Sequence, residues 1–155
     1  MTFENGLTAS FDLLIAIPPH QVPQVVTSAK LTNDSGWIPV DERTLRTPQS
    51  NVFAIGDVTT IPLASGFTLP KAGVFALNQA EVVAHNIAAE INGRVVHREF
   101  SGDGYCFLET GNGRAGYISG NFFAKPSPLA SFYEPSVKYH WAKVVFEKYW
   151  LWRWF

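Results

Sequence analysis

The organisation of this chain follows from one short run of residues, Asn51-Val52-Phe53-Ala54-Ile55-Gly56-Asp57-Val58. The apolar residues Val52 to Ile55 predict a short buried strand, because β-branched side chains precede a glycine stop. Gly56 lets the backbone approach another group closely, and Asp57 places a carboxylate where the strand ends. In open α/β sheets, ligands bind at this carboxyl edge. The run therefore predicts a site for a ligand with hydroxyl groups and an electron-poor ring.

A helix predicted over Lys71–Ile91 completes this unit. Thr68 is its predicted cap, with Pro70-Lys71 in the first turn, and Asn92-Gly93 is its predicted end. Its predicted apolar face consists of Ala76, Ala80, Val83, Ala84, Ile87 and Ile91.

The segments before the Gly-Asp run predict short elements. Asn5-Gly6 predicts the turn of a β-hairpin over Thr2–Ile17, whose second strand is residues 11–17. Residues 22–31 predict one or two helical turns, and a turn at 33–36 precedes a short extended piece at Trp37–Asp41.

After the helix, the pattern changes to a period of two residues. Three strands are predicted, over residues 95–100, 105–109 and 114–119, with the turn of the last pair at Gly111-Asn112-Gly113. A proline-rich linker, Lys125–Pro128, leads to the tail. We expect a small antiparallel β unit here.

Composition limits the classes of function. The net charge of −1 and the lack of a basic cluster exclude a nucleic-acid surface. Charged residues make up 16% and aromatic residues 14%, which indicates apolar surface that needs a partner. A single cysteine excludes an internal disulfide, and no apolar run is long enough to span a membrane. The first residues lack a signal-peptide pattern, so we expect a cytoplasmic or peripheral inner-membrane location.

Two motifs resemble a known group of flavoproteins. Thr47 and the strand that ends at Gly56-Asp57 resemble the second flavin motif of the pyridine nucleotide-disulfide oxidoreductase superfamily. The segment Leu69-Pro70-Lys71-Ala72-Gly73-Val74-Phe75-Ala76, with Gln79-Ala80, is similar to the sulfide:quinone oxidoreductase and flavocytochrome c sulfide dehydrogenase branch. The resemblance covers nearly the whole chain, as the C-terminal part of a longer protein. An ordinary strand-to-turn junction is the alternative interpretation of Gly56-Asp57.

The resemblance implies an α/β fold, or α+β for this piece alone. It is part of a flavoprotein with two dinucleotide-binding domains, a small antiparallel β unit and a C-terminal helix. Residues 1–17 would end the pyridine-nucleotide-type domain as a truncated hairpin, and residues 18–93 would be the C-terminal part of the FAD-binding domain. Residues 94–135 would form the β unit, and residues 136–155 an aromatic, membrane-interfacial helix.

The resemblance also implies cofactor-binding residues. Asp57, following Gly56, would hydrogen-bond the ribityl chain of FAD. The small residues Ala72 and Gly73 would let the flavin pyrimidine approach the helix start, whose free N–H groups favour electron density there. Lys71 would serve the same purpose or contact a quinone; the alternative is a solvated lysine in the first helical turn.

Cys106 has two interpretations. A lone cysteine within an apolar strand is commonly an inert core residue. The setting Gly104-Tyr105-Cys106-Phe107 resembles the redox cysteine of sulfide:quinone oxidoreductases, which is followed by an aromatic residue that contacts the quinone. Cys106 would then be catalytic and Phe107 quinone-contacting, with partner cysteines in the missing N-terminal half.

The tail from Tyr139 to Phe155 predicts an aromatic helix with His140, Lys143 and Glu147 on one face. Tryptophan and basic residues together suit a helix that lies in the membrane interface, although docking on its own protein is the alternative. The predicted interface residues are Trp141, Trp150, Trp152 and Trp154.

The leading hypothesis is therefore the C-terminal part of an FAD-dependent oxidoreductase that passes electrons from a sulfur substrate to a quinone. The alternatives are a type II NADH dehydrogenase-like flavoprotein and a non-catalytic interaction module. The chain has no Gly-x-Gly-x-x-Gly loop for the FAD pyrophosphate. We accordingly expect this piece alone to be inactive, to bind no FAD, to self-associate, and to need no metal.

Overall fold

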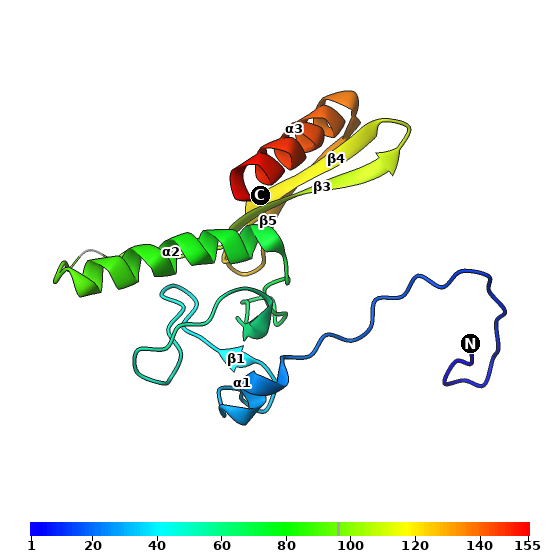
Figure 1. The fold of residues 1–155 in the computed structure, drawn as a ribbon. Coiled ribbons are helices and arrows are strands. Elements are labelled where there is room, and N and C mark those ends of the chain that lie inside the picture. Colours follow the sequence, from blue (N-terminus) through cyan, green and yellow to red (C-terminus); the bar gives the residue numbers. More distant parts are fainter. Residues whose placement is uncertain (96) are drawn as a thin grey trace.

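The computed structural model describes residues 1–95 and 97–155, which form three successive parts (Figure 1). An extended arm, residues 1–23, projects away from the rest of the molecule. A middle part of short elements and loops lies along one long helix, and a sheet covered by a helix completes the chain. The predicted class is confirmed: the fold is mixed α/β, with a small antiparallel sheet and a C-terminal helix.

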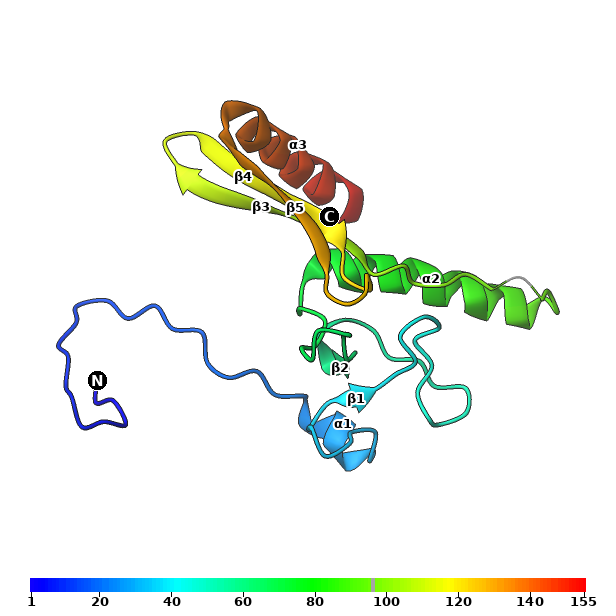
Figure 2. The same ribbon diagram turned by 180° about the vertical axis from the view of Figure 1, so that it is seen from behind.

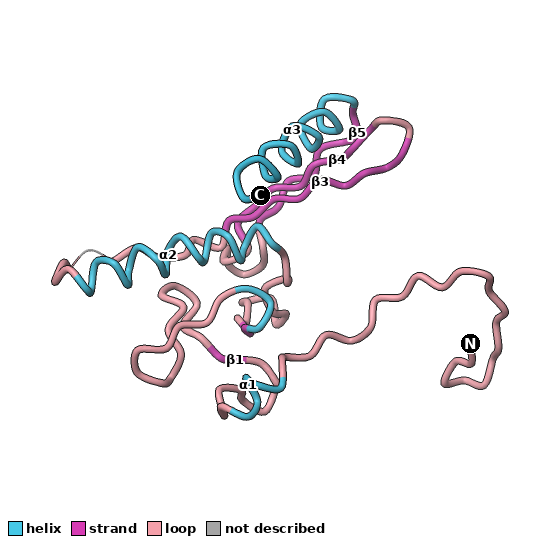
Figure 3. The backbone as a smooth tube through the Cα atoms, in the orientation of Figure 1, coloured by secondary structure: helices cyan, strands magenta, loops and turns pink. Residues whose placement is uncertain are grey.

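The arm contains the turn predicted at Asn5-Gly6 but lacks the second strand of the predicted hairpin. An antiparallel bridge joins Thr2 to Thr8, and Gly6 has a φ of +82°. Residues 9–23 then run as irregular chain (Figure 3). The strand predicted over 11–17 is therefore wrong, because nothing in the described part of the chain lies alongside to take up its backbone hydrogen bonds.

The middle part begins with three short elements. Helix α1 spans Gln24–Ser28, inside the predicted segment 22–31. Strands β1 (Ile38–Pro39) and β2 (Thr59–Thr60) pair in parallel, so the extended piece predicted at Trp37–Asp41 is confirmed at Ile38–Pro39.

The strand predicted over Val52–Ile55 forms only in part. Phe53 makes a single antiparallel bridge to Arg46. The chain then enters a 3-10 helix, η1 (Gly56–Val58), in which Gly56 has a φ of +70°. This left-handed conformation turns the backbone directly after Ile55. The run Asn51–Val58 therefore forms a single β-bridge followed by a turn, and not a continuous strand.

Helix α2 spans Gly73–Ile91 and begins later than predicted. Its N-cap is Ala72, so Pro70-Lys71 lies before the first turn, contrary to the prediction. Thr68 does not cap the helix, because it pairs with Pro62 in an isolated antiparallel bridge.

The buried face of α2 differs from the predicted apolar face. Ile87 and Ile91 are 38% and 80% exposed. Two polar side chains, Gln79 and Asn86, are buried because each hydrogen-bonds the backbone of a neighbouring segment. The helix ends at Asn92-Gly93 as predicted, with Gly93 at a φ of +64°. The buried residues of α2 are Phe75, Gln79, Val82, Val83, Asn86 and Ala89.

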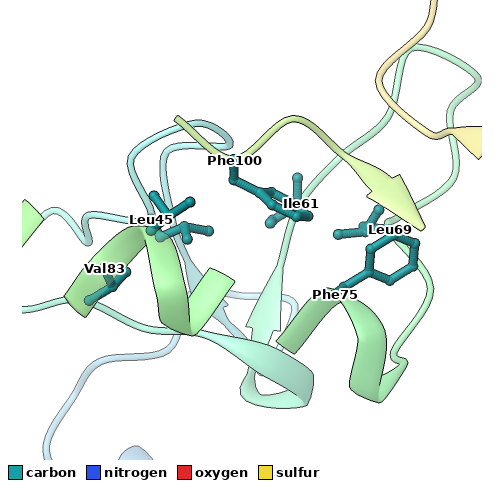
Figure 4. Packing of buried hydrophobic residues seen from close by; sticks show 7 residues of the cluster. Leu45, Ile61, Leu69, Phe75, Val83 and Phe100 are labelled. Carbon is teal, nitrogen blue, oxygen red and sulfur yellow. The ribbon is translucent and has the colours of Figure 1, made fainter. Parts of the chain in front are cut away.

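One hydrophobic core joins α2 to the loops that cross it (Figure 4). Phe100 is 1% exposed, Ile61 is 2% exposed, and the rings of Phe75 and Phe100 meet edge to face at 6.3 Å. The core consists of Leu45, Ile61, Leu69, Phe75, Val82, Val83 and Phe100. It fixes the start of α2 against the segment that carries Gly56 and Asp57.

The strand predicted over residues 95–100 is wrong. Residues 97–100 are irregular, and residue 96 lies outside the described residues. The Asn86 side chain takes the place of a neighbouring strand: its Oδ1 accepts from the Arg98 amide at 2.7 Å, and its Nδ2 donates to the Arg98 carbonyl at 2.9 Å.

The C-terminal sheet has the order β3-β4-β5 and is antiparallel. Strands β3 (Asp103–Gly111) and β4 (Arg114–Asn121) contain the predicted strands and are joined by the predicted turn at 111–113. Strand β5 (Leu129–Ser136) was not predicted, so the proline-rich linker leads to this strand before the tail helix.

Helix α3 spans Val137–Trp154 and covers one face of this sheet (Figures 1 and 2). Ser136 is its N-cap, with Oγ accepting from the Tyr139 amide at 3.4 Å. The rings of Tyr117 and Tyr139 stack at 5.4 Å between strand and helix. The opposite face carries exposed apolar residues, including Phe132 at 53%.

Candidate functional site

The turn at Gly56–Thr59, called the Gly-Asp turn below, is held by side chains on both sides. The Gly56 amide donates to Gln79 Oε1 at 2.6 Å, and Thr59 Oγ1 donates to the Gly56 carbonyl at 2.8 Å. A Cβ added at Gly56 would lie 3.2 Å from the Ala76 Cβ, so glycine also lets the turn approach α2 closely. The turn is thus fixed relative to the start of α2.

Lys71 ties the same turn to the segment before α2. Its Nζ donates to the carbonyls of Asp57 at 2.5 Å and Thr59 at 2.9 Å. It also lies 3.4 Å from the centre of the Trp37 ring, a cation–π contact. Burial lowers the pKa of Lys71, and the nearby Asp57 carboxylate partly opposes this shift. Lys71 is exposed and lies before the first turn of α2, which begins at Gly73, so the alternative of a solvated lysine is wrong only in placing it within that turn.

The Asp57 side chain remains exposed beside the start of α2. A small cavity of about 10 Å³, room for one water molecule, adjoins Asp57, Lys71 and Ala72. A Cβ added at Gly73 would meet nothing within 4 Å, so the surface over the helix start is open. The turn thus presents a free carboxylate as acceptor next to helix amides as donors.

A larger groove, the Cys106 groove, begins at the same helix start. It has a volume of about 490 Å³ and lies between the start of α2, strand β3 and the C-terminal half of α3. Cys106 is exposed and lines this groove with Ala72 and Gly73, so the structure brings these three predicted residues together. The lining residues are Ala72, Gly73, Val74, Leu77, Tyr105, Cys106, Phe107, Lys143, Phe146, Glu147, Trp150 and Leu151.

The interpretation of Cys106 as a buried core residue is wrong, because the thiol is exposed. Tyr105 and Phe107 both pack on Phe146 of α3, with ring centroids 6.4 and 6.3 Å apart. Side chains alternate along a strand, so Cys106 points away from this aromatic pair. As β3 is at the edge of the sheet, both sides of the strand reach the groove.

A group of charged side chains lies at the wall formed by α3. Glu109 Oε1 is 3.1 Å from His140 Nδ1 and 3.7 Å from Lys143 Nζ. Lys143 Nζ is also 3.9 Å from Glu147 Oε2. The spacing of His140, Lys143 and Glu147 predicts their shared helical face, and this prediction is confirmed.

Comparisons with known proteins point to one group of enzymes. The mitochondrial sulfide:quinone oxidoreductase of Schizosaccharomyces pombe is 32% identical over 123 residues, covering 79% of this chain and 25% of that protein. The sulfide-quinone reductase of Aquifex aeolicus is 31% identical over 149 residues, covering 88% of this chain and 33% of that protein. The chain is homologous to sulfide:quinone oxidoreductases.

The solved structure of the Aquifex aeolicus sulfide:quinone oxidoreductase matches with a TM-score of 0.76 and 28% sequence identity, over 88% of this chain and 33% of that one. No protein-family model matches the chain. The chain thus spans between a quarter and a third of the length of these sulfide:quinone oxidoreductases.

The four predicted interface tryptophans do not share one environment. Trp141, Trp152 and Trp154 are 61%, 78% and 51% exposed, whereas Trp150 lines the Cys106 groove and packs on Phe146 at 5.9 Å. Among the described residues, no helix is long and apolar enough to cross a membrane. The sequence did not predict that Trp150 lines the groove. Its spacing of four residues from Phe146, which places the two on one helical face, is the signal that could have shown it.

Two further findings concern the site. Trp37, which covers the Lys71 ammonium, was not singled out from the sequence because the two residues are 34 positions apart. Within residues 1–95 and 97–155, no group of three or more His, Cys, Asp or Glu side chains is arranged to hold a metal ion.

Proposed function

We propose that this chain is the C-terminal part of an FAD-dependent oxidoreductase of the sulfide:quinone oxidoreductase type. One observation carries the proposal: an exposed cysteine, Cys106, shares a groove of about 490 Å³ with the start of helix α2, beside the Gly-Asp turn. Homology to sulfide:quinone oxidoreductases over most of the chain supports the same assignment.

The residues at the Gly-Asp turn fit a flavin. The exposed Asp57 carboxylate would accept hydrogen bonds from ribityl hydroxyl groups, and Gly56 keeps that carboxylate close to α2. Open space over Gly73 leaves room for a flat ring at the helix start, where free amides favour negative charge. When bound, FAD would supply two-electron transfer between the sulfur substrate and the quinone.

Lys71 positions the backbone of the Gly-Asp turn. Its ammonium group already donates to the Asp57 and Thr59 carbonyls and lies against the Trp37 ring. We assign it the role of holding the backbone of Asp57, and thereby the direction of its carboxylate. This replaces the direct flavin or quinone contact expected from the sequence alone.

In the Cys106 groove, Cys106 would work with a cysteine from another part of the longer protein as the entry point for electrons. The aromatic wall of Phe107, Phe146 and Trp150 suits a flat apolar quinone head group. The exposed tryptophans of α3 would place the mouth of the groove near a membrane surface, from which a lipid-soluble quinone enters.

The test compares quinone reduction driven by sulfide and by NADH in the FAD-loaded longer protein. Sulfide-driven reduction is expected, and Cys106→Ala and Cys106→Ser should both abolish it while leaving FAD bound, because neither side chain provides a thiolate. An inert Cys106 would leave turnover unchanged. NADH-driven reduction that is equal in all three proteins, without sulfide activity, would instead identify a type II NADH dehydrogenase-like enzyme.

A further inference from the structure

A second depression adjoins the Cys106 groove, and we call it the Asp103 depression. It has a volume of about 580 Å³ and lies between one end of the sheet and Asn78 of α2. Tyr105 lines both spaces, whereas the thiol of Cys106 and the charged residues of α3 line only the Cys106 groove. The polar and aromatic lining of the Asp103 depression includes Asn78, Asp103, Tyr105, Tyr117, Ser119 and Asn121.

The strand register places this lining on one face of the sheet. Side chains alternate along a strand, so Asp103 and Tyr105 of β3 share a face. Their partners across the ladder are Asn121 and Ser119 of β4, so the four side chains are neighbours. Tyr105 packs on Phe146 with ring centroids 6.4 Å apart, so this face is the one that α3 covers. The depression is the part of that face which α3 leaves open, at the end of the sheet next to α2 (Figure 1).

The carboxylate of Asp103 is held in position in this depression. Asn121 Nδ2 donates to Asp103 Oδ1 at 2.8 Å and to the Ser101 carbonyl at 3.0 Å. Asn78 Nδ2 donates to the Asp103 carbonyl at 3.3 Å, which holds the backbone from the side of α2. Within the described part of the chain, no group donates a hydrogen bond to the second carboxylate oxygen, Oδ2. One oxygen of a positioned, exposed carboxylate is therefore available to a ligand.

The charge of the lining selects the sign of a ligand. Among the residues that the structure describes, Asp103 is the single charged residue of this lining. Burial raises the pKa of Tyr117, with a smaller contribution from Tyr105, so this phenol adds no negative charge at neutral pH. The rings of Tyr105 and Tyr117 lie 6.1 Å apart, and aromatic rings attract cations through their faces. A ligand anion would meet a carboxylate without a neighbouring cation, whereas a ligand cation would meet a carboxylate and two aromatic rings.

We propose that the Asp103 depression binds an alkylammonium group. The Asp103 carboxylate provides the opposite charge, and the rings of Tyr105 and Tyr117 contact the alkyl groups on the nitrogen. This inference goes beyond the proposed function and does not depend on it. Two sources share this chemistry, a free ammonium ion such as choline and the headgroup of a membrane lipid. The C-terminal end of α3, with the exposed Trp154, lies at the same end of the sheet, so a lipid headgroup has access (Figures 1 and 2).

The first experiment measures choline binding to this chain by saturation-transfer NMR on the methyl signal of choline. Asp103→Asn keeps the shape of the side chain and should weaken binding about fivefold, because an exposed pair of opposite charges contributes up to about this factor. Tyr105→Leu should weaken binding about two- to fivefold through loss of a cation–π contact. The matched controls, Glu134→Gln and Tyr133→Leu on β5, are exposed residues outside the depression and should bind choline as the wild type does.

A ligand control uses the wild type alone, so it does not depend on how any variant folds. The carbon analogue of choline has a tert-butyl group in place of the trimethylammonium group, and therefore the same shape without the charge. We expect it to bind several-fold more weakly than choline. Equal binding of choline and this analogue, equal choline binding by the wild type and Asp103→Asn, or no choline binding by the wild type would each overturn the inference.

The second experiment distinguishes the two sources of the ammonium group by sedimentation with lipid vesicles. If the ligand is a lipid headgroup, Asp103→Asn should bind phosphatidylcholine vesicles about threefold more weakly than the wild type. Binding to phosphatidylglycerol vesicles, whose headgroup has no ammonium group, should be equal in the two proteins. Equal binding of both proteins to both kinds of vesicle, together with choline binding that depends on Asp103, would identify a free alkylammonium ion as the ligand.

Discussion

The middle part and the sheet–helix unit are stabilised in different ways. The middle part buries seven hydrophobic residues in one core between α2 and its loops. In the sheet–helix unit, α3 and the strands meet through half-exposed aromatic side chains, and none of the described residues of α3 is buried. The first region therefore fixes a backbone in place, and the second offers an apolar surface to a ligand or partner.

This difference separates two kinds of site. The Gly-Asp turn is held by buried or clamped side chains, which suits the exact placement of a carboxylate and of helix amides. The Cys106 groove lies where the two regions meet, with one wall from each. A rigid wall and an uncovered aromatic wall together suit a ligand that enters and leaves.

The largest effect is expected from the core of the middle part. Phe100→Ala removes a ring that is 1% exposed and should lower the free energy of unfolding by about 3–5 kcal/mol. Phe132→Ala, at a ring 53% exposed on the sheet, should cost far less. Urea denaturation of the isolated chain measures both. Equal losses would contradict the contrast between the two regions.

The next largest loss of stability is expected where the middle part packs against the sheet–helix unit. A Cβ added at Gly104 of β3 would overlap the ring of Phe75 on α2. Gly104→Ala should therefore destabilise the chain by about 1–3 kcal/mol through overpacking. Gly73→Ala is the control, because a Cβ there meets nothing within 4 Å. A neutral Gly104→Ala, measured by the same denaturation, would mean that the sheet moves freely against α2.

A smaller effect tests the clamp on the Gly-Asp turn. Trp37→Leu and Lys71→Met each remove one side of the cation–π contact. A double-mutant cycle should give a coupling energy of about 0.5–1 kcal/mol. Strict additivity of the two single losses would show that the tryptophan does not hold the lysine.

The smallest effect is expected in the pH dependence of stability, through Asp41 in the middle part. Hydrogen bonds from the Thr44 amide at 2.7 Å and the Thr44 hydroxyl at 2.8 Å lower the pKa of Asp41 below its usual 3.8. The folded state then binds fewer protons than the unfolded state, so this stabilisation is present above pH 3.8 and is lost as pH falls through the lowered value. The urea midpoint should fall between pH 5 and pH 3. Asp41→Asn should reduce that fall, and an unchanged fall would assign it to other groups.

The sequence predicted elements with strong local signals. The turn at Gly111-Asn112-Gly113, the end of α2 at Asn92-Gly93 and the shared face of His140 and Lys143 all depend on nearby residues. The sequence predicts the start of α2 too early, because Thr68 is a suitable N-cap residue. In the fold Thr68 instead pairs with Pro62 in an isolated bridge.

The failed predictions depend on distant parts of the chain. The strand expected at 95–100 is replaced by hydrogen bonds from Asn86, a helix residue whose alignment with Arg98 is a tertiary property. The clamp of Trp37 on Lys71 and the groove that joins Cys106 to Trp150 likewise unite residues far apart in sequence. Motif resemblance found Cys106 and the helix start, but only the fold shows that they share one groove.

The reactivity of the chain's single cysteine directly tests the proposal that the Cys106 groove holds a quinone. The rate of Cys106 alkylation by iodoacetamide is measured with and without decylubiquinone, whose fully substituted ring cannot add the thiol. We predict at least fivefold slower alkylation with saturating quinone, and loss of this protection in Trp150→Ala, where the aromatic wall is gone. An alkylation rate that saturating quinone leaves unchanged would contradict quinone binding in this groove.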